Sequence, residues 1–166
     1  MNFRSIKISI AAMLAGAASL PTSAAAHDFK VGTLELQHPW SAKAPPVAPV
    51  LGGYVTIVNS GSEADRLIGG STPVAERFEI HQSSIIDGVA RMRPAKEGID
   101  IPAGATVSLQ PGGAHIMLIN PRQRPDEGEK FKATLEFEKA GAVEVEFVVQ
   151  KPKPASQPED HSGHQP

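Results

Sequence analysis

The chain consists largely of short runs rich in Val, Ile, Leu, Phe and Thr, and each run is bounded by Gly, Pro, Asn or Asp. No long stretch has the 3.6-residue apolar period of an amphipathic helix, so the pattern predicts an all-β fold. The number and spacing of the runs suit a single-domain β-sandwich or Greek-key barrel. The candidate strands are residues 30–37, 51–59, 65–68, 76–83, 89–93, 106–110, 115–119, 132–138 and 143–150.

Residues 1–26 have the pattern of a secretory signal peptide. Basic residues precede an apolar run over residues 8–20, and the small residues 24–26 offer a cleavage site before His27. The apolar run is too short for a stable membrane span, and no later stretch is long and apolar enough to insert. We therefore expect an exported, soluble, periplasmic protein.

The mature chain is expected to divide into a folded domain and a tail. Residues 27–150 are long enough for one core, whereas residues 151–166 are rich in Pro and polar residues and are expected to be disordered. Loss of Arg4 and Lys7 with the leader leaves 14 basic residues against 18 acidic ones, a net charge of −4. This balance does not favour nucleic acid or an anionic membrane as a partner.

A histidine and a methionine are expected to meet on one β-hairpin. Met92 is one of the two methionines that remain after the leader. If Asp87-Gly88 forms a two-residue type I′ turn, His81 lies opposite Pro94 and shares a face with Met92. Diagonal neighbours of this kind lie roughly 7–8 Å apart, which is within reach of a shared ion.

His115 and Met117 form a second pair, because residues two apart on a strand project from the same face. With His81 and Met92, these side chains from two hairpins are expected to surround one ion near the surface. Imidazole nitrogen and thioether sulfur favour Cu(I), whereas carboxylates and carbonyls favour Ca, Mg or Mn. The chain contains no cysteine. We therefore expect a Cu(I) site of His81, Met92, His115 and Met117 that needs no carboxylate.

The spacing of these residues resembles the motif of the periplasmic PCu(A)C copper chaperone family. Ten residues separate His81 from Met92, and twenty-two separate Met92 from the His115-x-Met117 pair. The resemblance covers residues 30–148 and includes the flanking segments 88–94, 101–104 and 111–118. It implies a cupredoxin-like fold and Cu(I) binding through two His and two Met. It also implies delivery of copper to the CuA centre of cytochrome c oxidase, often together with a Sco-type protein.

The remaining histidines are weaker candidates. After cleavage behind residue 26, the free amine and imidazole of His27 could chelate Cu(II) together. His161 and His164 form a sparse patch in the tail that could also capture Cu(II). Binding of a second, oxidised copper ion at the termini is therefore an open alternative. His38, near the end of the first predicted strand, is expected to have a structural or surface role.

Other functions compete with copper delivery. A copper-storage or resistance protein would retain its copper and hold more than one ion per chain, and a β-sandwich interaction module would bury the methionines and bind no metal. An electron-transfer cupredoxin is disfavoured because a blue-copper site requires a Cys thiolate. The chain has no nucleophile motif, no recognisable carboxylate pair and no His-Glu-x-x-His cluster. We expect a protein that is not an enzyme.

Overall fold

The structure is a computed structural model, which describes residues 28–151. In this range the chain forms strands and no helix, which confirms the all-β prediction, and accordingly no helix here could cross a membrane. The expected signal peptide, residue 27 and the tail after residue 151 lie outside the described residues. The strands are β1 (Phe29–Val31), β2 (Leu34–Ala42), β3 (Val50–Asn59), β4 (Asp65–Ser71), β5 (Ala75–Ile86), β6 (Val89–Pro94), β7 (Ile99–Ile101), β8 (Thr106–Leu109), β9 (Ala114–Pro121), β10 (Lys130–Phe137) and β11 (Gly141–Gln150).

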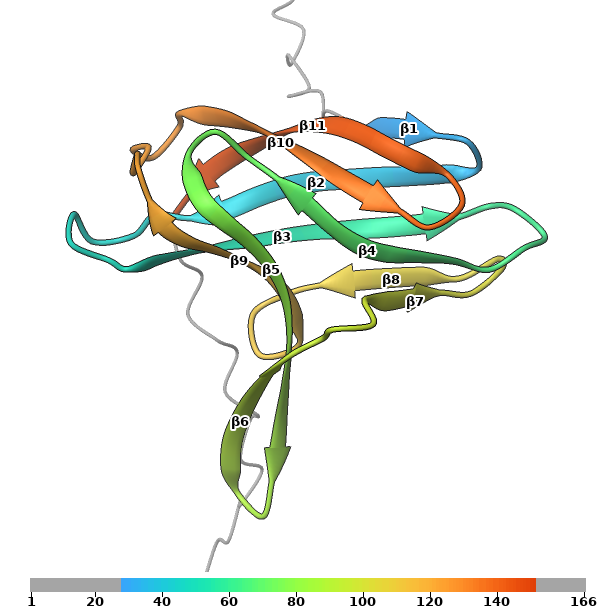
Figure 1. Ribbon diagram of the computed structural model, residues 1–166, viewed down its shortest axis with the longest axis horizontal. Helices are drawn as coiled ribbons and strands as arrows, with labels where there is room; N and C mark the ends of the chain where they lie inside the picture. Colours follow the sequence, from blue (N-terminus) through green and yellow to red (C-terminus); the bar gives the residue numbers. More distant parts are fainter. Residues whose placement is uncertain (1–27, 152–166) are drawn as a thin grey trace, which may run out of the picture.

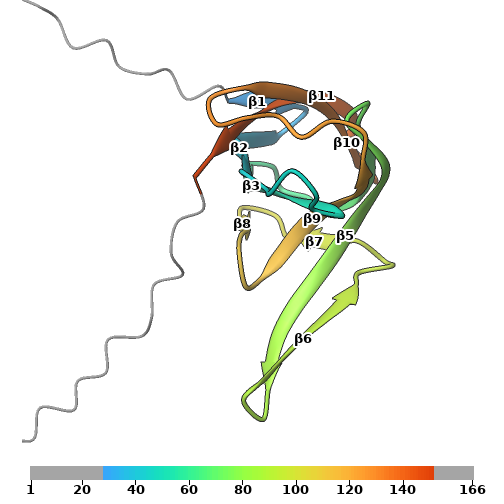
Figure 2. The same ribbon diagram turned by 90° about the vertical axis from the view of Figure 1, so that its left-hand side faces the viewer.

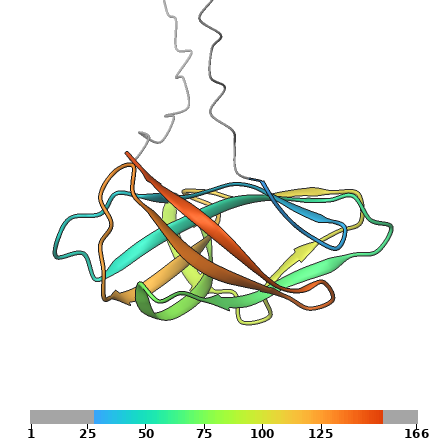
Figure 3. The same cartoon turned by 90° about the horizontal axis from the view of Figure 1, so that it is seen from above.

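All the strands belong to one continuous sheet that curls around a core (Figure 1). Its main order is β6-β5-β9-β3-β2-β11-β10-β4-β7, while β1 pairs with β2 and β8 pairs with β3. Strands β11 and β2 run parallel, with Val148 opposite Trp40. The two ends of the sheet approach each other, because β4 contacts β5 and β7 contacts β3. The view from above shows the long strands crossing obliquely over the enclosed core (Figure 3).

Alternation along the strands builds this core. In β10, Phe131 and Leu135 are buried, whereas Lys132 between them is exposed. Phe131 stacks on Phe147 of β11, with ring centroids 5.4 Å apart and planes 10° apart. Each large apolar side chain that is fully buried contributes about 1.5–3 kcal/mol. The curled sheet is therefore held by its inward-facing residues, and its outer face is free to carry polar groups.

The predicted bounds of the first strand, residues 30–37, are wrong. Gly32, with φ 57°, lies in the turn that separates β1 from β2, and β2 then continues to Ala42. A bulge between Gln37 and Trp40 lets the strand go on beyond its predicted end. The strands expected from the sequence do not include β7, because its three residues are too few to display a period.

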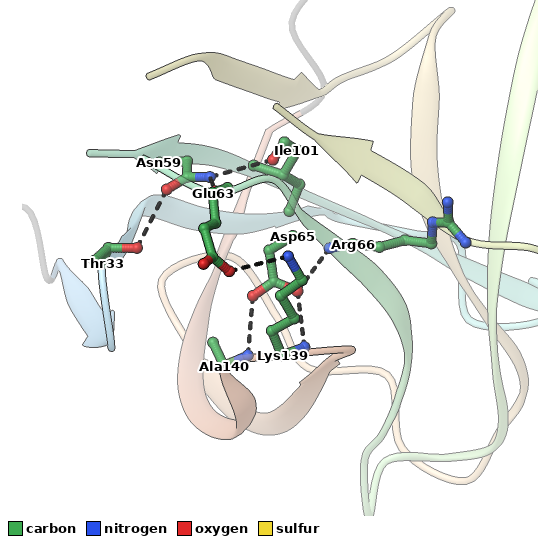
Figure 4. Close-up of polar contacts among 8 residues, drawn as sticks. All are labelled: Thr33, Asn59, Glu63, Asp65, Arg66, Ile101, Lys139 and Ala140. Atoms are coloured by element: carbon green, nitrogen blue, oxygen red, sulfur yellow. Dashed lines mark hydrogen bonds and ion pairs between the residues drawn. The ribbon is translucent and has the colours of Figure 1, made fainter. Parts of the chain in front are cut away.

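Asp65 joins the start of β4 to the turn between β10 and β11 (Figure 4). Its carboxylate accepts hydrogen bonds from the backbone N–H groups of Arg66 at 2.7 Å and of Lys139 and Ala140 at 2.9 Å each. Burial raises the pKa of Asp65, but these three donors and the nearby Lys139 charge outweigh burial and hold the pKa below its ordinary value. The folded structure therefore stabilises the ionised form of Asp65.

Asn59 plays a similar role at the end of β3 (Figure 4). Its buried amide donates to the backbone carbonyls of Glu63 at 2.8 Å and Ile101 at 3.2 Å. Its side-chain oxygen accepts a hydrogen bond from the hydroxyl of Thr33 at 3.2 Å. These contacts tie the β3–β4 loop to β7.

Candidate metal site on three adjacent strands

The hairpin formed by the end of β5 and by β6 projects away from the curled sheet (Figure 2). Asp87-Gly88 forms its turn with φ values of 53° and 73°, the positive values that a type I′ turn requires. His81 pairs with Pro94, and Met92 pairs with Ser83, so His81 and Met92 are diagonal neighbours on one face. The predicted turn, register and shared face are confirmed.

Strand β9 runs along the other side of β5 and adds the second pair of side chains. His81 lies directly opposite His115, and Glu79 lies directly opposite Met117. The imidazole rings of His81 and His115 have centroids 6.0 Å apart and planes tilted by 41°. We call His81, Met92, His115 and Met117 the His/Met cluster. By register, its members share one face of the neighbouring strands β6, β5 and β9.

The expectation that these side chains come from two hairpins is wrong. One hairpin supplies His81 and Met92, but β8, which precedes β9 in the chain, pairs with β3 instead of with β9. The pair His115 and Met117 reaches the cluster because β9 lies between β5 and β3. The site therefore depends on long-range sheet pairing as well as on a local turn.

Exposure rises across the His/Met cluster. The buried core residues Ile80 and Ile116 lie on the opposite face, as alternation predicts. His115 is 7% exposed and the side chain of His81 is 12% exposed, whereas Met92 is 53% exposed. The imidazole pair is thus largely buried, and the Met92 end of the cluster is open to solvent.

Each imidazole has one ring nitrogen beside a hydrogen-bond partner. Nδ1 of His115 lies 2.9 Å from the carbonyl oxygen of Gly113, and Nε2 of His81 lies 2.9 Å from Oε2 of Glu79. The other oxygen of Glu79 lies 3.4 Å from Nη1 of Arg77. Nδ1 of His81 is buried and has no hydrogen-bond partner within the described part of the chain.

Glu79 is the residue that the sequence prediction missed, because a set of neutral ligands was expected. The signal was present, since Glu79 precedes His81 by two residues and strand alternation places both on one face. What the sequence could not show is that its carboxylate turns toward the ring of His81 rather than into solvent.

His38, the remaining histidine among residues 28–151, does not join the cluster. His38 is exposed, has φ 49° within the β2 bulge, and its Nε2 lies 3.1 Å from the amide nitrogen of Gln150. His27, His161 and His164 lie outside the described residues, so a second Cu(II) site at the termini stays a prediction. Within residues 28–151 no group of three or more His, Cys, Asp or Glu is arranged to hold a metal ion.

The chain is similar in sequence to a known protein and in fold to solved structures. The protein named "Putative lipoprotein Lxx21020" of Leifsonia xyli subsp. xyli is 30% identical over 132 residues, which cover 77% of this chain and 78% of that protein. The copper-bound PCuAC domain from PmoF2 is 28% identical with a TM-score of 0.65, covering 76% of this chain and 99% of the domain. The CuI form of DR1885 from Deinococcus radiodurans is 26% identical with a TM-score of 0.59, and the match covers 79% of this chain and 85% of DR1885.

The structural likenesses to PCuAC domains confirm the cupredoxin-like fold that the sequence resemblance implied. The match to a family model agrees with them, because residues 34–149 fit the model described as LpqE-like. This chain therefore belongs to the LpqE-like family, which is the PCuAC family.

Proposed function

We propose that the protein is a copper chaperone that binds one Cu(I) ion at the His/Met cluster. The observation that carries this proposal is the strand register, by which two histidines and two methionines share one face of β6, β5 and β9. Neutral nitrogen and sulfur ligands of this kind suit a soft monovalent cation. Further support comes from similar solved structures, since the PmoF2 domain is described as copper-bound and DR1885 as a CuI form.

The recipient that we propose is the CuA centre of cytochrome c oxidase, reached either directly at the CuA subunit or through a Sco-type protein. The gradient of exposure supports release to such an acceptor, because Met92 is far more exposed than His115. A thiolate binds Cu(I) more strongly than a thioether does, so acceptor cysteines would displace Met92 first and the buried imidazoles last.

The projecting hairpin is the place where we expect the acceptor to dock. Ile85 and Val89, which are 77% and 56% exposed, lie close to its turn, and Arg91 and Arg93 are exposed on β6. Exposed apolar side chains beside arginine are typical of protein interfaces. The two positive charges favour an acceptor with an acidic surface around its copper-binding cysteines.

We also propose that the protein acts in the periplasm after export and that it carries copper rather than catalysing a reaction. The chain's apolar leader pattern and the family's lipoprotein relatives support export. The proposed site supports carriage without catalysis, since we assign all four of its His and Met side chains to holding the ion.

Transfer to a defined acceptor tests delivery. The mature protein is loaded with one equivalent of Cu(I) without oxygen, mixed with a purified apo CuA domain, separated from it, and the copper in each protein is measured. We expect copper to move to the CuA domain. Retention of copper would instead indicate storage, as would binding of more than one ion per chain in a separate titration with excess Cu(I). Failure to bind copper at all would favour a non-metal interaction module.

A further inference from the structure

The two imidazoles of the His/Met cluster use different ring nitrogens for their hydrogen bonds. A carbonyl oxygen can only accept, so Nδ1 of His115, 2.9 Å from the Gly113 oxygen, carries the proton in that contact. An ionised carboxylate can likewise only accept, so Nε2 of His81, 2.9 Å from Glu79, carries the proton in the other. In neutral rings, these contacts leave the lone pair on Nε2 of His115 and on Nδ1 of His81.

The free nitrogen of His81 is also the atom that lacks a partner. Nδ1 of His81 is buried and makes no hydrogen bond within residues 28–151. A buried polar atom in a native protein normally has a partner, and an atom without one calls for an explanation such as an ion. Its ring lies on the face that carries His115 and Met92, so an ion held there would supply the missing contact.

We propose that Cu(I) is bound by Nδ1 of His81 and Nε2 of His115, and that Glu79 is a positioning residue that selects the first of these nitrogens. The inference rests on the proposed copper function. Glu79 suits this role because it faces Met117 across β5 and β9, and its second oxygen lies 3.4 Å from Arg77, which orients the carboxylate. A carboxylate that accepts the far N–H of a ligating imidazole fixes the ring and raises its basicity.

Nitrogen NMR tests the assignment without any mutation. The histidine rings of 15N-labelled mature protein are observed by long-range proton–nitrogen correlation, before and after one equivalent of Cu(I), at mildly alkaline pH where an ordinary imidazole is neutral. Cu(I) has a filled d shell and leaves these signals visible. We expect the large copper-induced shift at Nδ1 of His81 and at Nε2 of His115. A shift at Nε2 of His81 would overturn the proposal.

Variants of Glu79 test its positioning role. In Glu79→Ala we expect Cu(I) affinity to fall roughly 10–100-fold and the His81 ring to populate both neutral tautomers. Glu79→Gln keeps an oxygen that accepts the N–H, so the tautomer and part of the affinity should return. The matched control is Glu76→Ala, which removes the same charge from an exposed position on β5.

The outcomes separate this inference from the proposed function. Normal stoichiometric binding with an unchanged His81 tautomer in Glu79→Ala, or an equal loss of affinity in Glu76→Ala, would overturn the role of Glu79 and leave the copper site intact. Absence of both copper binding and ring-nitrogen shifts in the wild-type protein would overturn the copper site and this inference together.

Discussion

His81 on β5 lies directly opposite His115 on β9, and the centroids of their imidazole rings are 6.0 Å apart. The two strands are not consecutive in the chain, so the main sheet rather than a local turn sets this pairing. Met92 is added from the other side by the projecting hairpin. A firmly held imidazole pair and an exposed thioether are thus combined in one proposed site.

Cu(I) should stabilise the folded protein, because an ion that binds only the folded state adds RT ln(1 + [Cu]/Kd). At a free Cu(I) concentration one hundred times Kd the gain is about 2.7 kcal/mol. We expect a rise in Tm when one equivalent is added without oxygen and its reversal by a Cu(I) chelator. The same Tm with and without copper would contradict binding at the folded site.

Gly88→Ala should weaken copper binding without unfolding the domain. Gly88 has φ 73°, a conformation that costs a residue with a side chain about 1–2 kcal/mol. The hairpin projects from the sheet, so we expect this cost to loosen the β5–β6 pairing that places Met92, while the core stays intact. Amide hydrogen exchange over residues 82–93 should accelerate and Cu(I) affinity should fall. Gly104→Ala, which has a similar φ of 66° but lies away from the hairpin, is the control.

Charge reversal on the hairpin should slow delivery more than it changes binding. In an Arg91→Glu/Arg93→Glu variant, an acidic acceptor would be repelled, and we expect the rate of copper transfer to fall at low ionic strength and the difference to shrink at high salt. Cu(I) affinity should stay close to that of the wild type, since neither arginine is a proposed ligand. Equal transfer rates at every salt concentration would contradict docking at this hairpin.

Asp65→Asn should lower stability at neutral pH by about 1–3 kcal/mol, because an amide cannot accept all three backbone N–H bonds. The folded-state pKa of Asp65 is lowered, so its contribution is fully present above the unfolded pKa of about 3.9 and is lost as the pH falls through the folded value. Chemical denaturation across this acid range should show wild type and variant converging as the pH falls. The exposed substitution Glu127→Gln should show neither effect.

Local features of the sequence predicted the part of the site that depends on residues close together in the chain. The Asp87-Gly88 turn and the two-residue period of strands are enough to place His81 and Met92 on one face, and the structure agrees. The same period places Ile116 toward the core and His115 away from it. These relationships follow from chain geometry over a few residues.

The parts that the sequence did not reveal depend on contacts between distant segments. No turn specifies that β9 lies beside β5, so the direct pairing of His81 with His115 could not be derived from the β5–β6 hairpin or from the sequence of β9 alone. The orientation of the Glu79 carboxylate is a side-chain choice that alternation does not decide. The continuation of β2 past residue 37 depends on a bulge at His38, where a positive φ is unusual for a residue with a side chain.

The most direct measurement is an oxygen-free titration of the mature protein with Cu(I) against a competing chelator, beside a Met92→Leu/Met117→Leu variant. Leucine keeps nearly the same volume and removes only the thioether, so the variant should stay folded, and Val47→Ala, at an 87% exposed position, is the control. We expect one tightly bound ion in the wild type and the control, and a large loss of affinity in the double variant. Unchanged binding in the double variant, or no binding in the wild type, would contradict a Cu(I) site at the His/Met cluster.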